Sequence, residues 1–132
     1  MLYSKVSEQA DSDVRNFEDG YSKYSKLVYV SHPFGGLANN AGSAQAITDI
    51  LNTKELEKKN REHVYITPVT VFQGLYNVAD YNDGLNMCLA LLKRCAGGIV
   101  MCGDWTNSRG CMAEFKYAKE NGIPIYMLNE LI

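Results

Sequence analysis

The sequence predicts a single α/β domain, built in three layers, in which helices cover both faces of a parallel sheet. Short apolar runs rich in β-branched and aromatic residues alternate along the chain with longer segments of helical periodicity. Gly, Pro and Asn stand at the boundaries between these segments. The chain has 132 residues, of which 46% are hydrophobic, so it can bury one core but not two.

Four segments are predicted as strands: 26–31, 63–68, 98–102 and 123–128. Helices are expected from about residue 40 to 51, around 85–95 and over 109–121. Because parallel strands need crossover connections, each helix should bury its apolar side on the sheet. The charged run 54–62 is predicted as a solvated face, and 69–81 as a long loop.

The N-terminal segment is predicted to be separate from this domain, which we place at residues 26–132. Residues 1–25 are polar and rich in Ser, Asp, Glu and Tyr, and 12–17 could form a short helix. We interpret them as an arm or extension that packs on the core or on a partner chain.

Composition excludes several classes of function. A net charge of -2 and a pI near 5.6 leave no basic stripe for nucleic acid. No apolar stretch approaches the roughly 20 residues of a membrane helix, and no secretory leader is visible. Cysteines at 88, 95, 102 and 111 have neither C-x-x-C spacing nor nearby histidines, so we expect no metal and no cofactor. Reduced, buried thiols suit a cytoplasmic protein.

Two polar loops follow predicted strands, at 31–36 and at 103–110. The carboxyl ends of parallel strands are where α/β proteins bind ligands, so both loops should lie at the same end of the sheet. Adjacent Gly35 and Gly36 allow close approach to a ligand, or an ordinary tight turn. Neither a dinucleotide fingerprint nor a P-loop is present.

Glu114 is the residue that most needs explaining. It falls on a helical stripe with Cys111, Phe115 and Ala118 that is otherwise apolar. If Ser108 caps this helix, the capping-box position is Cys111, so Glu114 is not a cap partner. The alternative is an exposed glutamate favoured by the helix dipole.

Other side chains near these loops have both a structural and a functional interpretation. Residues 106–110 could serve as a helix cap or as an anion or sugar-hydroxyl site, with Gly110 giving a ligand room at the first turn. His32 could act in acid–base chemistry, and Phe34 and Trp105 could stack on a base or sugar, or simply pack. Asp80, Asp83 and Asp104 are possible second carboxylates, each individually more typical of a turn.

Taken together, segments 27–36, 84–95, 103–114 and 118–124 resemble the nucleoside 2-deoxyribosyltransferase-like superfamily over about residues 26–128. The likeness is greatest to its small bacterial and phage members of the DUF4406 type. The most specific part is the spacing Ser108-x-Gly110-x-x-x-Glu114, followed by Ala118 and by Gly122-x-Pro124.

The resemblance implies a flavodoxin-like or Rossmann-like fold with four to five parallel strands, and cleavage of the N-glycosidic bond of deoxynucleosides or their 5′-monophosphates. It implies that Glu114 is the nucleophile and that Ser108 and Gly110 hold a phosphate. It also implies a homo-oligomer, a dimer or larger. The ligand-contacting residues expected on this basis are Ser31, His32, Phe34, Gly35, Gly36, Asp104, Trp105, Ser108 and Gly110.

Three positions depart from that pattern, and one of them is the acid that often precedes the third strand, where this chain reads Cys95-Ala96-Gly97. The aspartate that protonates the leaving base in active members falls here near Cys88 or Leu89, and Phe34 stands where monophosphate hydrolases have arginine. Asp83 or Asp80 could replace the missing acid, so we take Glu114 and Asp83 as the candidate catalytic residues. The second hypothesis is a protein that binds a nucleotide or nucleotide-derived signal without cleaving it. A third is a scaffold that assembles through its N-terminal arm.

Overall fold

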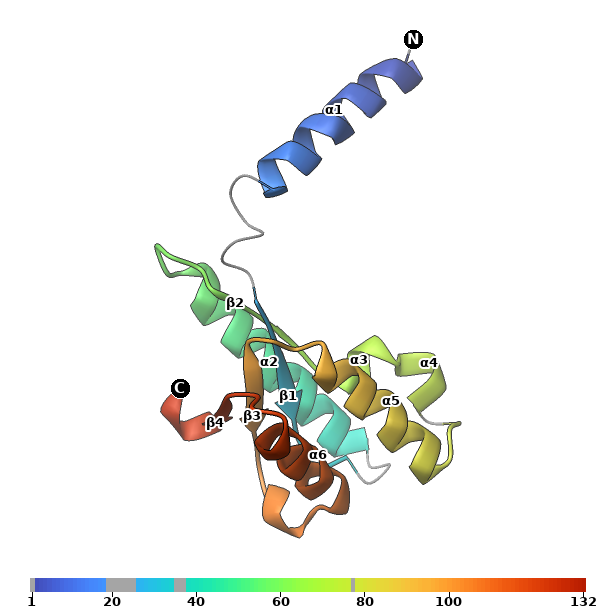
Figure 1. The fold of residues 1–132 in the computed structure, drawn as a ribbon, viewed down its shortest axis with the longest axis vertical. Helices are drawn as coiled ribbons and strands as arrows, with labels where there is room; N and C mark the ends of the chain where they lie inside the picture. The colour runs from blue at the N-terminus through green and yellow to red at the C-terminus, as the bar shows by residue number, and fades with distance from the viewer. Residues whose placement is uncertain (1, 19–25, 35–37, 77) are drawn as a thin grey trace.

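The computed structural model describes residues 2–18, 26–34, 38–76 and 78–132 and confirms the α/β prediction. Its sheet has four parallel strands in the order β2-β1-β3-β4 (Figure 1). The strands are β1 (Lys26–Ser31), β2 (His63–Ile66), β3 (Gly98–Met101) and β4 (Ile125–Met127).

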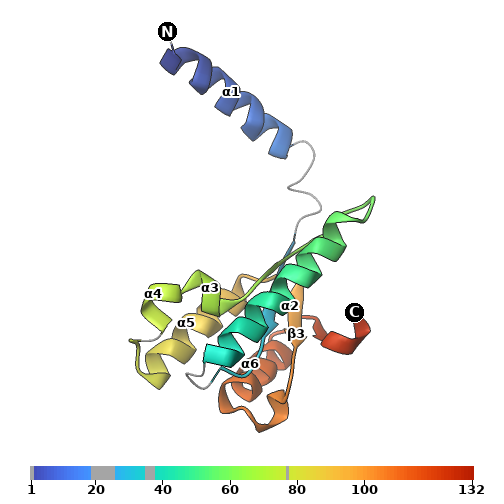
Figure 2. The same cartoon turned by 180° about the vertical axis from the view of Figure 1, so that it is seen from behind.

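The helices of the domain form the two outer layers. They are α2 (Ala38–Leu56), α3 (Pro68–Val71), α4 (Gln73–Tyr76), α5 (Tyr81–Lys93) and α6 (Arg109–Glu120), with single turns η2 (Trp105–Asn107) and η3 (Leu128–Glu130). The helix α2 covers one face of the sheet and α5 and α6 cover the other (Figures 1 and 2). Helix α1 (Leu2–Asn16) stands away from the sheet in both views.

Alternation along β1 divides the core into two parts. Val28 and Val30 pack towards α2, whereas Tyr29 packs with buried residues of α5 and α6. Because side chains of a strand alternate between faces, Ser31 lies on the same side as Tyr29. The central strand therefore presents two hydroxyl groups to the layer that contains α6.

Close backbone approach explains two adjacent glycines at the start of β3. A Cβ atom on Gly97 would lie 2.7 Å from the Leu27 carbonyl oxygen, and one on Gly98 would lie 2.7 Å from that of Pro124. Gly98 also has a φ of +130°, which L-residues rarely adopt. Only glycine therefore lets the chain enter β3 between β1 and β4.

Three sequence-based predictions differ from the structure. The N-terminal helix is longer than 12–17, and 69–81 contains α3 and α4, with Pro68 at the first position of α3, where proline suits a helix. The prediction of a solvated run over 54–62 is wrong at Glu55, which is only 4% exposed. Glu55 continues the buried stripe of Ala44, Thr48 and Leu51, and that helical spacing is the signal that could have revealed it.

The loops that follow β1 and β3 meet at the carboxyl end of the sheet, as predicted. The Cys102 amide donates a hydrogen bond to the Ser31 carbonyl oxygen (2.9 Å). The Cβ position of Gly103 lies 3.4 Å from His32 Nε2, and Gly103 has a φ of +60°. Two loops whose bonded residues, Ser31 and Cys102, are 71 positions apart in sequence thus share one edge. None of the helices in the described part of the chain is long and apolar enough to span a bilayer.

Candidate functional site

A buried carboxylate is the centre of the candidate site. Glu114 lies in the second turn of α6 and is 7% exposed. Its Oε1 accepts a hydrogen bond from Ser31 Oγ at 3.3 Å, which joins α6 to the end of β1. Its Oε2 is buried and has no hydrogen-bond partner among the residues described. A buried acceptor without a partner is uncommon in a folded protein, so this carboxylate is a candidate functional group.

Local sequence accounts for this placement. Ser108 caps α6, as one of the two interpretations predicted, and its hydroxyl accepts a hydrogen bond from the Cys111 amide (3.3 Å). With the start of the helix set there, Cys111, Glu114 and Ala118 fall on the side that faces the sheet. Glu114 is thus held inward by the same periodicity that buries its apolar neighbours, and the exposed-glutamate alternative is wrong.

Tyr29 is a member of this cluster that sequence reasoning missed. Its hydroxyl is fully buried opposite Glu114 and, like Glu114 Oε2, lacks a partner of normal hydrogen-bond geometry among the described residues. The Cys88 thiol of α5 lies close enough to raise the pKa of Tyr29. Period-two alternation from Ser31 was the available signal, since it places Tyr29 on the face that Ser31 shares.

Burial dominates the electrostatics of the cluster. It raises the pKa of Glu114 from 4.5 to about 7, and the nearby hydroxyl groups of Tyr29 and Ser31 offset part of that effect. Burial also raises the pKa of Tyr29 well above its usual value, and the Glu114 charge raises it further. Glu114 is therefore poised between its acid and carboxylate forms near neutral pH, which is a property of many catalytic groups.

The strand-end loops bring some of the expected binding residues together. His32 is half-buried, and its Nδ1 pairs with the Pro33 carbonyl oxygen (2.8 Å), a geometry that suits the tautomer protonated there. Phe34 is half-buried beside it. Gly35 and Gly36 lie outside the described residues.

The second loop is arranged by contacts of its own. Asp104 is exposed, and both of its carboxylate oxygens accept hydrogen bonds from Asn107 Nδ2 (2.9 and 3.0 Å). The Trp105 ring packs against Phe115, with centroids 4.9 Å apart. Both side chains therefore have structural partners at the positions where the sequence suggested ligand contact.

The starts of α5 and α6 lie side by side. The Arg109 guanidinium stacks 4.2 Å over the Tyr81 ring, joining the first residues of the two helices. A Cβ atom on Gly110 would meet no atom within 4 Å, so there is free space at the first turn of α6. Asp83 is exposed in the first turn of α5, where its amide donates to the Asp80 cap (2.8 Å).

Metal chemistry has no visible basis in the region that the structure covers. No group of three or more His, Cys, Asp or Glu side chains there could hold an ion. All four cysteines are buried, and none of them forms a disulfide. The groups gathered around Glu114 are the hydroxyls of Ser31 and Tyr29 and the thiol of Cys111.

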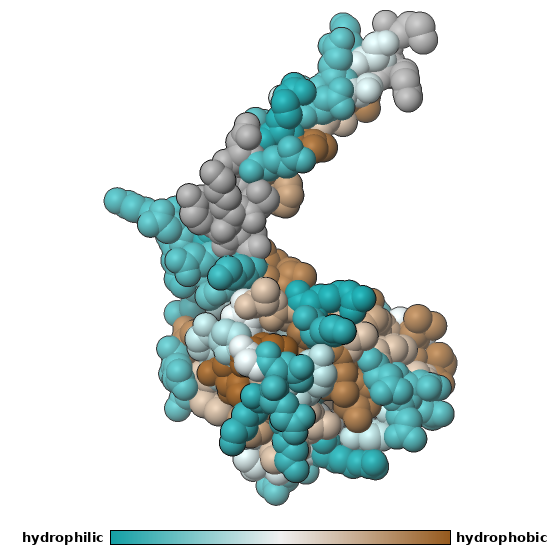
Figure 3. Space-filling model, viewed as in Figure 1, coloured by the Kyte–Doolittle hydropathy of each residue, from teal (hydrophilic) through white to brown (hydrophobic). Residues whose placement is uncertain are grey.

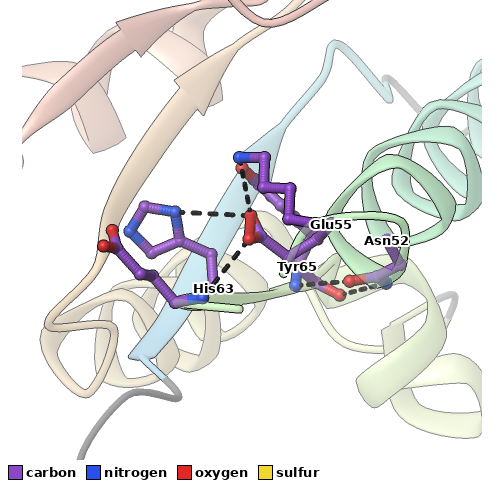
Figure 4. Close-up of polar contacts among 6 residues, drawn as sticks. Asn52, Glu55, His63 and Tyr65 are labelled. Carbon is purple, nitrogen blue, oxygen red and sulfur yellow. Dashed lines mark hydrogen bonds and ion pairs between the residues drawn. The ribbon is translucent and has the colours of Figure 1, made fainter. Parts of the chain in front are cut away.

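A second buried glutamate lies at the opposite, amino end of the sheet (Figure 4). Glu55 Oε1 lies 3.2 Å from Lys58 Nζ and 3.9 Å from His63 Nδ1, and Oε2 accepts a hydrogen bond from the Glu62 amide (3.3 Å). One turn earlier, Asn52 bonds both the amide and the carbonyl of Tyr65 (2.8 and 2.9 Å). These contacts fasten the end of α2 to the edge strand β2.

Comparison with known proteins identifies one family. No curated protein and no solved structure matches the chain at a significant level. The model of a domain of unknown function, DUF4406, matches residues 26–127, which is the whole sheet with its crossover helices and excludes α1. The chain therefore belongs to the DUF4406 family.

Proposed function

We propose that this protein is an N-glycosidase of the nucleoside 2-deoxyribosyltransferase-like type, with a nucleoside or nucleotide as substrate and Glu114 as nucleophile. The observation that carries the proposal is the Glu114 carboxylate, which is held by Ser31 through one oxygen while the other is buried without a partner. A structural carboxylate at this depth would have both oxygens bonded.

The chemistry follows from that geometry. Glu114 Oε2 attacks the anomeric carbon of the sugar through an oxocarbenium-like transition state, and a C–O bond forms as the C–N bond to the base breaks. The electron pair of the broken bond leaves with the base, which takes up a proton. Water, or a second base in a transfer reaction, then attacks the same carbon and releases Glu114 as a carboxylate.

The neighbouring groups support these steps. Ser31 fixes the orientation of the carboxylate, and the Tyr29 hydroxyl faces it. The first turn of α6, with Ser108 and the open space at Gly110, provides amide groups and room for the hydroxyl or phosphate end of the substrate. Asp83 at the start of α5 is the carboxyl group that we propose as proton source for the leaving base.

A second function has its own supporting observation. The α5 residue beside Tyr29 is the thiol Cys88 and not a carboxylic acid, and Leu89 is part of the surrounding apolar packing. Without an acid at this position, the same site would bind a nucleotide or nucleotide-derived signal and leave the glycosidic bond intact. For either function we expect a small-molecule ligand in the cytoplasm, a reducing compartment that suits four buried cysteines without a disulfide.

One experiment separates the two functions. The full chain is incubated with 2′-deoxynucleosides, ribonucleosides and their 5′-monophosphates, free base is measured by chromatography, and binding by calorimetry. Glu114→Gln should lower turnover by roughly 10⁴- to 10⁶-fold, as expected for loss of a nucleophile. Glu55→Gln, an identical change at the other end of the sheet, should leave turnover within a few-fold.

Each result decides between the hypotheses. Base release that survives in Glu114→Gln would remove the nucleophile assignment. Binding without base release in the wild type would support the second function. No binding of any of these ligands would exclude both.

A further inference from the structure

The candidate site holds a buried carboxylate that no positive group in the described structure balances. Glu114 Oε2 has no partner there, and the ion pairs seen among the described residues involve Glu55 at the other end of the sheet. Polar side chains, teal in Figure 3, lie at the outer surface over α5 and α6. The basic residues of β1, α5 and α6 are all exposed: Lys26, Lys93, Arg109, Lys116 and Lys119.

Histidine and the neighbouring loop do not supply the missing charge. His63 lies beside Glu55, and His32 Nδ1 pairs with the Pro33 carbonyl oxygen. Residues 35–37, which follow that loop in sequence, are Gly, Gly and Leu and have no ionisable side chain. One helical turn before Glu114, Gly110 leaves open space. A positive group of a substrate therefore has both room and a reason to bind near Glu114.

A second acid is also missing from the inner side of the site, as far as the structure describes it. The groups close to Glu114 and Tyr29 are hydroxyls and thiols, those of Ser31, Cys88 and Cys111. Burial raises the pKa of Tyr29, so its hydroxyl is a poor proton donor.

The proton source proposed above, Asp83, is outside this cluster. Asp83 is exposed and stands five residues before Cys88 on α5. At about 100° per residue, it points roughly 140° away from Cys88 around the helix. A leaving base that needs a proton must therefore obtain it from the solvent side, whereas a base that needs none can leave directly.

We propose that the preferred substrates are N-glycosides whose base already carries a positive charge, such as glycosides of pyridinium rings or of purines alkylated at nitrogen 7. This inference rests on the proposed function and narrows it. As Glu114 Oε2 bonds to the anomeric carbon, the electron pair of the broken C–N bond neutralises the base, which leaves without taking up a proton. Water then attacks the same carbon, its hydroxyl group stays on the sugar, its proton is released and the carboxylate is restored. Asp83 serves only neutral bases.

The charge of such a base also suits the carboxylate before the reaction. A cation within a few ångström of a buried carboxylate favours its ionised form, which is the form that attacks. The pKa of Glu114, about 7 in the protein alone, should therefore fall when a cationic substrate binds. A neutral nucleoside has no such effect, so the site selects for positive charge both in binding and in bond cleavage.

A matched pair of nucleosides tests the cleavage step in the full chain. At pH 6.5, 7-methylguanosine and guanosine differ by one methyl group and one charge, and nicotinamide riboside is a cation with an unrelated base. Each is supplied as the riboside and as its 5′-monophosphate, free base is measured by chromatography, and each rate is divided by the uncatalysed rate. Guanosine should be accelerated about 10²- to 10⁴-fold less than 7-methylguanosine, since that is the usual contribution of a general acid.

The outcomes separate this inference from the proposed function. Cleavage of only one of the two cations would identify the base as a purine or a pyridine. Equal acceleration of guanosine and both cations would overturn the inference and leave the proposed function standing. No base release from any of these substrates would remove the proposed function, and the inference with it.

Uncleavable analogues test the charge in binding alone. The carbocyclic analogues of nicotinamide riboside and of its uncharged 1,4-dihydro form have no glycosidic bond. Calorimetry at pH 8 should show the cation binding about tenfold more tightly to the wild type, since a nearby opposite charge is worth at least one pKa unit. Glu114→Gln should abolish this preference, and the matched control Glu55→Gln should keep it. A preference that survives in Glu114→Gln, or a wild type without one, would overturn the proposal.

Discussion

Two buried glutamates lie at opposite ends of the same sheet, and their surroundings differ. Glu55, at the amino end, has a lysine and a histidine beside one oxygen and a backbone amide on the other. Glu114, at the carboxyl end, has a serine on one oxygen and nothing on the other among the described residues. Similar burial thus accompanies two different electrostatic situations.

The difference shows how a structural carboxylate can be distinguished from a functional one. Glu55 fastens α2 to β2, and its partners compensate for the loss of hydration. Glu114 has no positive partner in the described structure, so its burial opposes its ionised form. The same isosteric change, Glu to Gln, should therefore affect folding stability with opposite sign at the two positions.

The largest stability effect is expected for Glu114→Gln. The folded-state pKa of Glu114 is about 7 and the unfolded value is 4.5. The folded state therefore holds the extra proton between these values, and the stability of the wild type declines as pH rises through that window. The full difference corresponds to about 3 kcal/mol. Urea unfolding at pH 4.5 and at pH 8 should show Glu114→Gln gaining about that much over the wild type at the higher pH. An equal difference at both pH values would contradict the raised pKa.

The opposite sign is expected for Glu55→Gln. The neutral side chain keeps an acceptor near the Glu62 amide but loses the charge that attracts Lys58 and strengthens the hydrogen bond. Its free energy of unfolding should fall by about 1 kcal/mol, because Lys58 is largely exposed and contributes little. The measurement is urea unfolding at pH 7, with Glu57→Gln, an exposed neighbour, as the control. A stabilised Glu55→Gln protein would remove the distinction between the two glutamates.

Gly110→Ala tests whether the ligand of the Glu114 site occupies the space at the first turn of α6. A methyl group there meets open space, and alanine is the better helix former, so the folded protein should become more stable by up to about 1 kcal/mol. Ligand binding should weaken, because the methyl group occupies the room at the first turn of α6. Thermal unfolding and calorimetry with the best ligand check the two effects. Unchanged affinity would show that the ligand does not reach this turn.

The smallest effect is expected for Tyr29→Phe. The nearby Tyr29 hydroxyl lowers the pKa of Glu114, so its removal should raise that pKa further. The titration of Glu114, followed by carbon NMR of the labelled carboxyl group, should move to higher pH. Tyr126→Phe, on the other face of the sheet, is the matched control and should leave the titration unchanged. A shift to lower pH in Tyr29→Phe would mean that the hydroxyl stabilises the neutral acid.

Local patterns were enough to predict the sheet, its parallel strands and the start of α6. Short runs of β-branched residues predicted β1 and β3. The predicted ends of these strands agree with the observed ends to within a residue or two, because the hydrophobic pattern of a strand differs strongly from that of a helix. The Ser108 cap and the apolar stripe placed Glu114 inward, since a helix start fixes which side each later residue faces. The polar loop after β3, residues 103–110, was also predicted from its local sequence.

Tertiary structure alone decided which groups surround each carboxylate. Tyr29 and Glu114 are 85 residues apart, and only the β1–β3 pairing with α6 folded over it brings them together. Glu55 was buried by the contact between α2 and the edge strand, which outweighs the charge of its sequence neighbours. Local sequence determines the direction in which a side chain points, but its hydration and its partners depend on what packs against it, and those energies arise between segments far apart in the chain.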